Sequence, residues 1–242
     1  TVMGGGANLL VRDKGIRGVV VCTSRMQNIA VSGNKICAEA GVSTVRTARE
    51  ACKAGLSGME FAGGIPGTLG GAAYMNAGAY GGEMKDVILS AKSLTFSGEI
   101  IDRSAEEMEF SYRRSIYRHV SEIILSAKFE LKKDDKLHIK EKMNEYITRR
   151  KQKQPLEYPS AGSTFKRPEG HYAGKLIEDA GLKGYRVGDA QVSEKHCGFV
   201  VNRGEATAED VKKLIRDVQD KVWDEFQVKL EPEVRIIPEN GL

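Results

Sequence analysis

The sequence contains little cysteine and proline and no long run of apolar residues. Only four cysteines and six prolines occur among its 242 residues, and the cysteines, at positions 22, 37, 52 and 197, form no C-x-x-C pair. A disulfide scaffold is therefore excluded, no metal site is expected, and a reduced, cytoplasmic setting is favoured. The 27 glycines follow no strict period and 40% of the residues are hydrophobic, which excludes a collagen-like or disordered chain.

The longest stretch without a charged residue, residues 61–82, has the length of a membrane-spanning helix. It contains eight glycines together with Pro66 and Asn76, which would make a poor helix, so no membrane span is expected. The first residues carry no basic segment followed by an apolar one, so no secretory signal is predicted. Thr1–Met3 is interpreted as the end of a buried strand whose preceding part is missing from this sequence.

The charge balance is almost even. Lys and Arg total 37 against 33 Asp and Glu, which gives a net charge of +4. A basic run at residues 149–153 leaves a nucleic-acid-binding module open as an alternative, but it has no aromatic stacking platform beside it. We interpret the run as the solvated end of a helix, and we expect no nucleic-acid partner.

Short strands with glycine-containing turns dominate the first half of the sequence. Strands are predicted at residues 18–21, 28–32, 35–40, 87–95, 98–102 and 123–131. In the last of these, Ile123, Leu125, Ala127, Phe129 and Leu131 alternate with residues of a mostly polar face. One helix is predicted between Ser43, as its N-terminal cap, and Gly55, with Val45, Ala48 and Cys52 on its apolar face.

The second half is richer in helix. Thr207 and Asp210 fit a capping box, and an apolar stripe at 211, 214, 215, 218 and 222 predicts a core-facing helix over residues 207–226. The charged run Lys132–Asp135 is interpreted as a domain boundary. The sequence thus predicts an α+β fold with domains at 1–133 and 134–242.

Two glycine segments have the composition of phosphate-binding loops. In residues 4–10 three adjacent glycines follow a predicted strand, and residues 55–82 contain ten glycines. Adjacent glycines expose backbone N–H groups and permit positive φ, so two such loops could hold a diphosphate from two sides. The pattern is not the G-x-G-x-x-G fingerprint of Rossmann proteins. Plain tight turns are the alternative for the first segment and a flexible surface loop for the second, although Ile65, Leu69 and Met75 favour a packed, buried loop.

Three further segments carry reactive side chains, each with a simpler alternative. Residues 110–118 hold three arginines among aromatic residues, which suit a carboxylate or phosphate but could also be a solvated face. Ser163 follows a glycine and precedes Lys166, although a serine in a turn is usually turn chemistry. Glu233 is predicted to lie within a buried strand, where an ion pair with Arg235 is the alternative.

Taken in order, six segments resemble the UDP-N-acetylenolpyruvoylglucosamine reductase family, in its shorter second type. They are GGGANLLV at 4–11, GGIPGTLGGAAYMNAGAYGGE at 63–83, YRRS at 112–115, AGSTFKRP at 161–168, AGKLIEDAGLKG at 173–184 and LEPEVR at 230–235. The resemblance implies an FAD-binding domain of the vanillyl-alcohol-oxidase (PCMH) type followed by a smaller α+β substrate-binding domain. It also implies that the first part of the FAD-binding domain is missing.

The resemblance assigns residues to the site. It implies that Arg113, Ser163 and Glu233 are catalytic and that Tyr112, Lys166 and Arg167 bind substrate, with Arg167 standing where some members have Asn. The implied FAD-binding residues are Gly4, Gly5, Gly6, Ala7, Asn8, Leu9, Gly63, Gly64, Ile65, Pro66, Gly67, Gly70, Gly71, Asn76, Gly78 and Ala79.

The implied activity is reduction of UDP-N-acetylglucosamine enolpyruvate to UDP-N-acetylmuramate by a monomeric flavoenzyme of peptidoglycan precursor synthesis, with non-covalent FAD and NADPH. Arg113 is suited to neutralise charge on the substrate carboxylate, and Ser163 to donate the proton, with Lys166 as a hypothetical source of positive potential. A related flavin oxidase and a non-catalytic flavin or nucleotide binder stay open as alternatives. Because all four histidines follow the glycine segments, a covalent flavin link is not expected.

Overall fold

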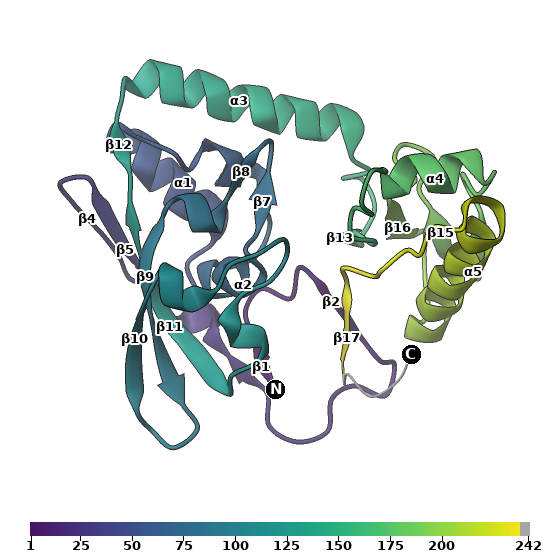
Figure 1. The fold of residues 1–242 in the computed structure, drawn as a ribbon, viewed down its shortest axis with the longest axis horizontal. Helices are drawn as coiled ribbons and strands as arrows, with labels where there is room; N and C mark the ends of the chain where they lie inside the picture. Colours follow the sequence, from purple (N-terminus) through teal and green to yellow (C-terminus); the bar gives the residue numbers. More distant parts are fainter. Residues whose placement is uncertain (238–242) are drawn as a thin grey trace. The chain divides into compact units, whose positions relative to one another are not determined.

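The computed structural model describes residues 1–237, which form two compact units (Figure 1). Unit 1 comprises residues 1–6 and 19–150, and unit 2 comprises residues 7–18 and the chain from Lys151 onward. Both units combine helices with mainly antiparallel strands, which confirms the predicted α+β class.

Unit 1 is built on a five-stranded sheet with the strand order β10-β9-β11-β5-β4. The strands of this sheet are β4 (Ile29–Ser32), β5 (Lys35–Glu39), β9 (Ile88–Thr95), β10 (Ile100–Ser104) and β11 (Glu122–Glu130). The other strands of unit 1 form two-stranded pairs and are β1 (Val2–Met3), β3 (Val21–Cys22), β6 (Leu56–Ser57), β7 (Gly78–Ala79), β8 (Gly82–Glu83) and β12 (Lys132–Lys133). The β4–β5 and β9–β10 hairpins were both predicted, and Gly33 and Gly98 have positive φ in their turns.

The helices of unit 1 contribute buried side chains to the same core as this sheet. They are α1 (Thr44–Lys53), α2 (Leu69–Met75) and most of α3 (Lys136–Lys153), and short 3-10 turns occur at 23–25, 60–64, 84–86, 106–108 and 116–118. Ile36 and Ala38 of β5 are buried with Ala48 of α1 and Ala73 of α2, whereas Cys37 between them is exposed. This alternation is expected for a sheet with one covered face.

The strand predicted at 123–131 exists as β11, but its buried face was only partly predicted. Ala127 and Phe129 are buried as expected, whereas the next buried residue toward the N-terminus is Ile124 rather than Leu125. The pairing with β9 shifts register between Ile124 and Ser126, so one residue is bulged out. A bulge reverses the alternation, which a strict period of two cannot anticipate.

Helices α1 and α2 differ in detail from what the sequence predicts. Ser43 caps α1 as predicted, its hydroxyl accepting a hydrogen bond from the N–H of Arg46. The fully buried residues of α1 are Thr44, Thr47, Ala48 and Ala51, whereas the predicted Cys52 is partly buried against the same core and Val45 is half-buried. Part of the second glycine segment, expected to be a loop, is the helix α2. Gly70 permits this helix to pack closely, since a Cβ there would lie 2.9 Å from the Cβ of Ala40.

Two short segments differ from their predictions, namely the expected buried strand at residues 1–3 and the expected domain boundary at residues 132–135. Strand β1 pairs in parallel with β3, but Val2 is exposed rather than buried, and only Val21 of the predicted strand 18–21 is in β3. Lys132 and Lys133, part of the charged run interpreted as a domain boundary, form β12 and pair with β6. Main-chain hydrogen bonding therefore fixes part of the charged run within unit 1.

Helix α3 begins in unit 1 and ends in unit 2. Its buried residues Ile139 and Met143 belong to the core of unit 1, and the division between units follows Arg150. The boundary predicted from the sequence, at 133/134, concerned the binding of FAD and substrate, and it stays a prediction.

Over the described residues, unit 2 contains a four-stranded antiparallel sheet, the last residues of α3 and two further helices. The sheet has the order β13-β16-β15-β14, and a separate parallel pair joins β17 to β2. The elements are β2 (Leu9–Val11), β13 (Ser160–Ser163), α4 (Ala173–Asp179), β14 (Arg186–Val187), β15 (Ala190–Val192), β16 (Phe199–Asn202), α5 (Ala208–Phe226) and β17 (Arg235–Ile237). The helix predicted at 207–226 is α5. Thr207 and Asp210 form its capping box, and four of the five stripe residues are fully buried, at 214, 215, 218 and 222.

Candidate functional site

The two predicted glycine segments meet within unit 1. A Cβ added to Gly4 would lie 2.2 Å from Oγ1 of Thr68, and one added to Gly5 would lie 3.1 Å from the Cα of Gly67. Gly6 and Gly67 both have positive φ. Two backbone turns can approach this closely only where no side chain intervenes, which is the physical reason for glycine at these positions.

Thr68 stands at this meeting point with an unused hydroxyl group. Its side chain is buried, it makes no capping hydrogen bond to α2, and its Oγ1 has no hydrogen-bond partner within the described chain. A buried hydroxyl without a partner carries a desolvation cost, which a ligand with a polar group beside it would remove. The cluster of Gly4, Gly5, Gly67 and Thr68 therefore fits a ligand rich in hydrogen-bond acceptors, such as a diphosphate.

At other glycines predicted to bind the cofactor, an added side chain would meet protein atoms. An added Cβ would lie 3.0 Å from Cε of Met143 at Gly63, 3.2 Å from Cδ of Arg150 at Gly64 and 2.7 Å from the carbonyl oxygen of Gly82 at Gly78. Burial of the Arg150 guanidinium lowers its pKa. These glycines permit the close packing of α3 and the tight β7–β8 hairpin. Gly71 differs, because its Cβ would be in ordinary contact with Oγ1 of Thr68 at 3.7 Å.

Asn76, predicted to contact the cofactor, is fully buried in a left-handed conformation at the end of α2. Its amide Nδ2 donates to the carboxylate of Glu83 and to the carbonyl oxygen of Ser111, and its Oδ1 accepts from the N–H of Lys85. Both amide hydrogens are thus used inside unit 1. These bonds link β8 to the turn at 111–114.

The remaining predicted cofactor residues of unit 1 lie on the same turns. Ile65 and Pro66 precede the Gly67–Thr68 turn, and the carbonyl oxygen of Ile65 accepts a hydrogen bond from the hydroxyl of Thr44. Ala79 lies in β7 opposite Gly82. These contacts fix the path of the backbone on both sides of α2.

Arg113 occupies a strained position in unit 1. Ser111 and Arg114 exchange two backbone hydrogen bonds of 3.1 Å, so Tyr112 and Arg113 form a two-residue turn. Arg113 has a φ of +56°, which costs a non-glycine residue about 1–2 kcal/mol. Its guanidinium donates to the carbonyl oxygen of Gly78 at 3.2 Å. Such strain in a charged residue is characteristic of functional sites.

Ser163 and Glu233 come from neighbouring segments of unit 2. Ser163 is the last residue of β13 and pairs with Phe199 of β16. The next residue, Thr164, accepts a hydrogen bond of 2.8 Å at its carbonyl oxygen from the N–H of Glu233. Glu233 is not within a strand as predicted, since it precedes β17. The structure therefore brings two predicted catalytic residues together in unit 2, while Arg113 belongs to unit 1.

Residues 7–9 of the first glycine segment belong to unit 2, unlike Gly4–Gly6. Asn8 donates a hydrogen bond of 3.1 Å from Nδ2 to the carbonyl oxygen of Glu233, and its own carbonyl accepts from the N–H of Arg235 at 3.0 Å. Leu9 begins β2, which pairs with β17. Asn8 and Leu9 thus support the segment that carries Glu233, and Ala7 directly precedes them.

The predicted substrate residues differ in their surroundings. The ring of Tyr112 is half exposed and lies 5.0 Å from the guanidinium carbon of Arg113. Lys166 forms an ion pair with Glu231, which offsets the positive potential that the sequence analysis assigned to it. The guanidinium of Arg167 lies 4.1 Å from the ring centre of Tyr172.

Sequence reasoning missed three polar residues beside these groups. Thr68 lies in the glycine-rich motif at 63–83 but was not predicted as a site residue. The sequence feature that could have identified it is a hydroxyl side chain between two pairs of adjacent glycines. His196 accepts a hydrogen bond of 3.0 Å from the N–H of Gly198, and burial lowers its pKa. A Cβ on Gly198 would lie 3.6 Å from Oγ of Ser163. The third residue, His119, follows the YRRS motif and contacts Arg114.

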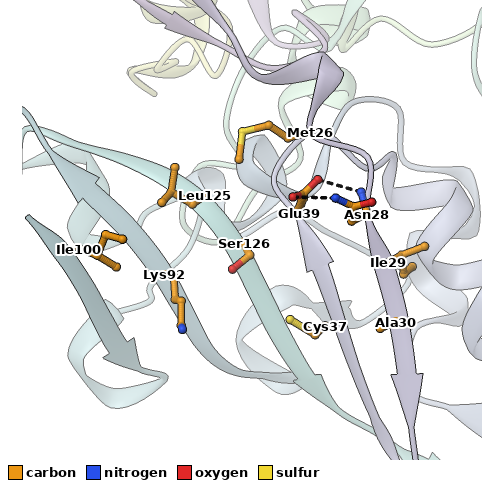
Figure 2. Close-up of a pocket in the computed structure, with 10 residues that line it drawn as sticks. All are labelled: Met26, Asn28, Ile29, Ala30, Cys37, Glu39, Lys92, Ile100, Leu125 and Ser126. Atoms are coloured by element: carbon orange, nitrogen blue, oxygen red, sulfur yellow. Dashed lines mark hydrogen bonds between the residues drawn. The ribbon is translucent and has the colours of Figure 1, made fainter. Parts of the chain in front are cut away.

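A hollow of about 450 Å³ lies on the uncovered face of the five-stranded sheet (Figure 2). It is lined by Met26, Asn28, Ile29, Ala30, Cys37, Glu39, Lys92, Ile100, Leu125 and Ser126, and it includes none of the predicted site residues. The carboxylate of Glu39 accepts hydrogen bonds from the backbone and side chain of Asn28, which lower its pKa. That carboxylate is therefore occupied by a structural contact.

Residues 1–237 lack two further kinds of feature. None of the helices there has the length and apolar character needed to cross a bilayer. No three His, Cys, Asp or Glu side chains in this part of the chain are grouped so as to hold a metal ion.

Two protein families match the chain, one on its N-terminal side and one on its C-terminal side, in the order predicted for the two domains. Residues 1–104 match a family described as "FAD binding domain", and residues 154–237 match one described as "UDP-N-acetylenolpyruvoylglucosamine reductase, C-terminal domain". These matches confirm the predicted FAD-binding fold at the N-terminal side. The polar groups around Thr68 and the glycine turns lie within the first match.

Individual proteins match almost the whole chain. The UDP-N-acetylenolpyruvoylglucosamine reductases of Agathobacter rectalis and Caldanaerobacter subterraneus are 55% and 56% identical over 99% and 98% of this chain. The chain spans 80% and 79% of their respective lengths. The crystal structure of UDP-N-acetylenolpyruvylglucosamine reductase from Thermus caldophilus superimposes with a TM-score of 0.87 at 38% identity, over 98% of this chain and 85% of that one. With its predicted motifs present in order and these relatives similar from end to end, the chain belongs to the UDP-N-acetylenolpyruvoylglucosamine reductase family.

Proposed function

We propose that this chain reduces the enolpyruvyl group of UDP-N-acetylglucosamine enolpyruvate to give UDP-N-acetylmuramate, in peptidoglycan precursor synthesis. NADPH is the reductant and FAD the non-covalent cofactor. The observation that carries the proposal is family membership over almost the whole chain. The enzyme adds a hydride to the terminal carbon of the enol ether and a proton to the neighbouring carbon.

The glycine turns of unit 1 would hold FAD. Gly4 and Gly5 bring the first turn directly against Gly67 and Thr68, and the unused hydroxyl of Thr68 can bond an oxygen of the flavin diphosphate. When bound, FAD supplies the hydride that is added to the substrate. The other predicted cofactor residues shape these turns through the packing contacts described above.

Arg113 is proposed to bind the substrate carboxylate. Negative charge builds on this carboxylate as the hydride is added, and a guanidinium fixed beforehand stabilises that charge without reorganising. The hydrogen bond to Gly78 and the two-residue turn both restrict its movement. Tyr112, next to it, is proposed to contact the substrate.

Ser163 is proposed to donate the proton from its Oγ to the carbon next to the carboxylate, and solvent then restores the hydroxyl. Glu233 is proposed to hydrogen-bond the substrate beside it. The backbone hydrogen bond between Glu233 and Thr164 supports this pairing, because it fixes Glu233 relative to the strand that ends at Ser163. Lys166 and Arg167 are proposed to bind the sugar nucleotide, with Lys166 in its ion pair to Glu231.

We further propose that residues 1–133 bind FAD and residues 134–242 bind substrate, and that the protein is a cytoplasmic monomer. The four unpaired thiols support a reduced compartment. Sedimentation of the FAD-loaded protein measures its oligomeric state.

Anaerobic rapid mixing tests the proposed reaction. NADPH should bleach the flavin absorption, and the enolpyruvyl sugar nucleotide should restore it without oxygen. Ser163→Ala and Arg113→Ala should leave the bleaching step intact and slow the recovery at least about 100-fold. Recovery with oxygen but not with the sugar nucleotide would instead support the flavin-oxidase alternative.

A further inference from the structure

The turn that carries Arg113 is held on one side by the end of α2. The hydroxyl of Ser115 donates to the carbonyl oxygen of Tyr74 at 2.8 Å, and Asn76 donates to the carbonyl oxygen of Ser111 at 3.0 Å. Both anchors are buried side chains. They fix the two ends of the segment 111–115, on either side of Tyr112 and Arg113.

The other side of the turn is held by an exposed arginine–histidine pair. Arg114 directs its Nε and Nη2 groups to the Nε2 atom of His119, at 3.0 and 2.6 Å. A guanidinium has no lone pair to offer, so the imidazole must be the acceptor, uncharged and with its proton on Nδ1. His119 immediately follows the short 3-10 turn at 116–118 and so belongs to a different local element from the turn it contacts.

Arg114 is directly coupled to the conformation of Arg113. Its backbone closes the two-residue turn through both hydrogen bonds to Ser111, and Arg113 is the residue before it, in the left-handed region. If the Arg114 side chain were released, the turn could relax toward the commoner conformations, with Arg113 leaving positive φ. The guanidinium of Arg113 would then lose its position beside Gly78.

We propose that His119 is a positioning residue for Arg113, acting through the side chain of Arg114. The proposal rests on the proposed role of Arg113 in binding the substrate carboxylate. His119 does not touch the substrate. It supplies an uncharged acceptor that holds Arg114, and Arg114 in turn fixes the strained turn.

The first test separates the two half-reactions of the FAD-loaded enzyme. His119→Ala should leave the rate of flavin reduction by NADPH unchanged and slow anaerobic reoxidation by the enolpyruvyl sugar nucleotide about tenfold, because a misplaced group of this kind affects only the step it serves. His119→Gln retains an uncharged acceptor and should recover most of the rate. His119→Lys, which cannot accept the bond, should not recover it.

A matched control is His138, another exposed histidine of unit 1, which pairs with Asp134. His138→Ala should leave both half-reactions unchanged. Equal slowing of both half-reactions in His119→Ala, or an equal loss in His119→Gln and His119→Ala, would overturn the proposal.

A second measurement needs no catalysis. Hydrogen exchange of the backbone amides of Ser111 and Arg114, which close the turn, should accelerate in His119→Ala and in Arg114→Ala, by the same factor in each and no further in the double variant. Unchanged exchange in His119→Ala overturns the coupling.

The variant Arg113→Ala separates the proposed role of Arg113 from the proposed role of His119. If Arg113→Ala slows reoxidation and His119→Ala does not, only the positioning role fails. If Arg113→Ala has no effect on reoxidation, the proposed catalytic role of Arg113 fails, and the exchange measurement still decides whether His119 holds the turn.

Discussion

The side-chain amide of Asn8 donates a hydrogen bond to the backbone carbonyl oxygen of Glu233, a residue 225 positions further along the chain. The backbones of the two segments continue this contact as the parallel pair β2–β17. A residue that sequence reasoning assigned to FAD thereby supports the segment that carries a proposed catalytic carboxylate.

This contact predicts the effect of Asn8→Asp. The substitution keeps the shape of the side chain but replaces the donor with an acceptor, so the bond to Glu233 is lost. We expect flavin reoxidation by the sugar nucleotide to fall about tenfold, the equivalent of one lost hydrogen bond, while the affinity for FAD stays within about twofold. Rapid mixing measures the first quantity and flavin fluorescence titration the second. A large loss of FAD affinity with a normal reoxidation rate would contradict this prediction and support Asn8 as an FAD-binding residue.

Thr68→Val is expected to have opposite effects on two quantities. Without FAD, removal of a buried hydroxyl that has no partner should raise the free energy of unfolding by about 1–3 kcal/mol. The affinity for FAD should fall about tenfold, because the hydroxyl is no longer available to the diphosphate. Urea unfolding of the FAD-free protein and fluorescence titration with FAD measure the two effects. Thr68→Ser is the matched control, and it should retain the affinity.

Gly4→Ala should reduce stability through a steric clash. The new Cβ would lie 2.2 Å from Oγ1 of Thr68, and overpacking of this kind typically costs about 1–3 kcal/mol. Thermal unfolding should show the loss, and adding Thr68→Ala should restore stability but not FAD binding. Gly71→Ala, whose Cβ would meet the same atom at an ordinary 3.7 Å, is the control and should unfold like the parent protein. An equal effect of the two alanines would show that the predicted clash is relieved by backbone movement.

The ion pair between Arg103 and Glu122 predicts a pH dependence of stability. Hydrogen bonding to Arg103 lowers the pKa of Glu122, whose side chain is 5% exposed. Its contribution to stability is therefore fully present above the ordinary glutamate pKa of about 4.3 and is lost as the pH falls through the lower folded-state value. Urea unfolding between pH 3 and 7 should show this loss, and Glu122→Gln should flatten it. A variant with the same acid profile as the parent would contradict the assignment.

The sequence predicted the hairpins, α1 and α5 because each is encoded locally. Gly33 and Gly98 permit their turns, and Thr207 caps α5 whatever the rest of the chain does. The bulge in β11 was not predictable, since it depends on the register adopted against β9, a partner far away in sequence.

The site was predicted from motifs, and motifs do not distinguish contact from support. Asn76 and Gly78 lie in the same glycine-rich motif as Thr68, yet the structure uses the first two internally and leaves only the Thr68 hydroxyl without a protein partner. That difference depends on which atoms fold together, and no spacing encodes it. The resemblance to a family therefore identified the segment that forms the site, but not which of its atoms are available to a ligand.

The division of the chain into units also determines how it can be cut. Since residues 7–18 belong to unit 2, the peptide passes from one unit to the other three times, after Gly6, Gly18 and Arg150. A protease that cleaves only at Arg150 releases residues 151–242 from the rest covalently, but β17 can still pair with β2, which stays attached to unit 1 at both ends of residues 7–18. Residues 151–242 produced alone would lack β2, so β17 would present an unpaired edge, which a fused copy of residues 7–18 could fill.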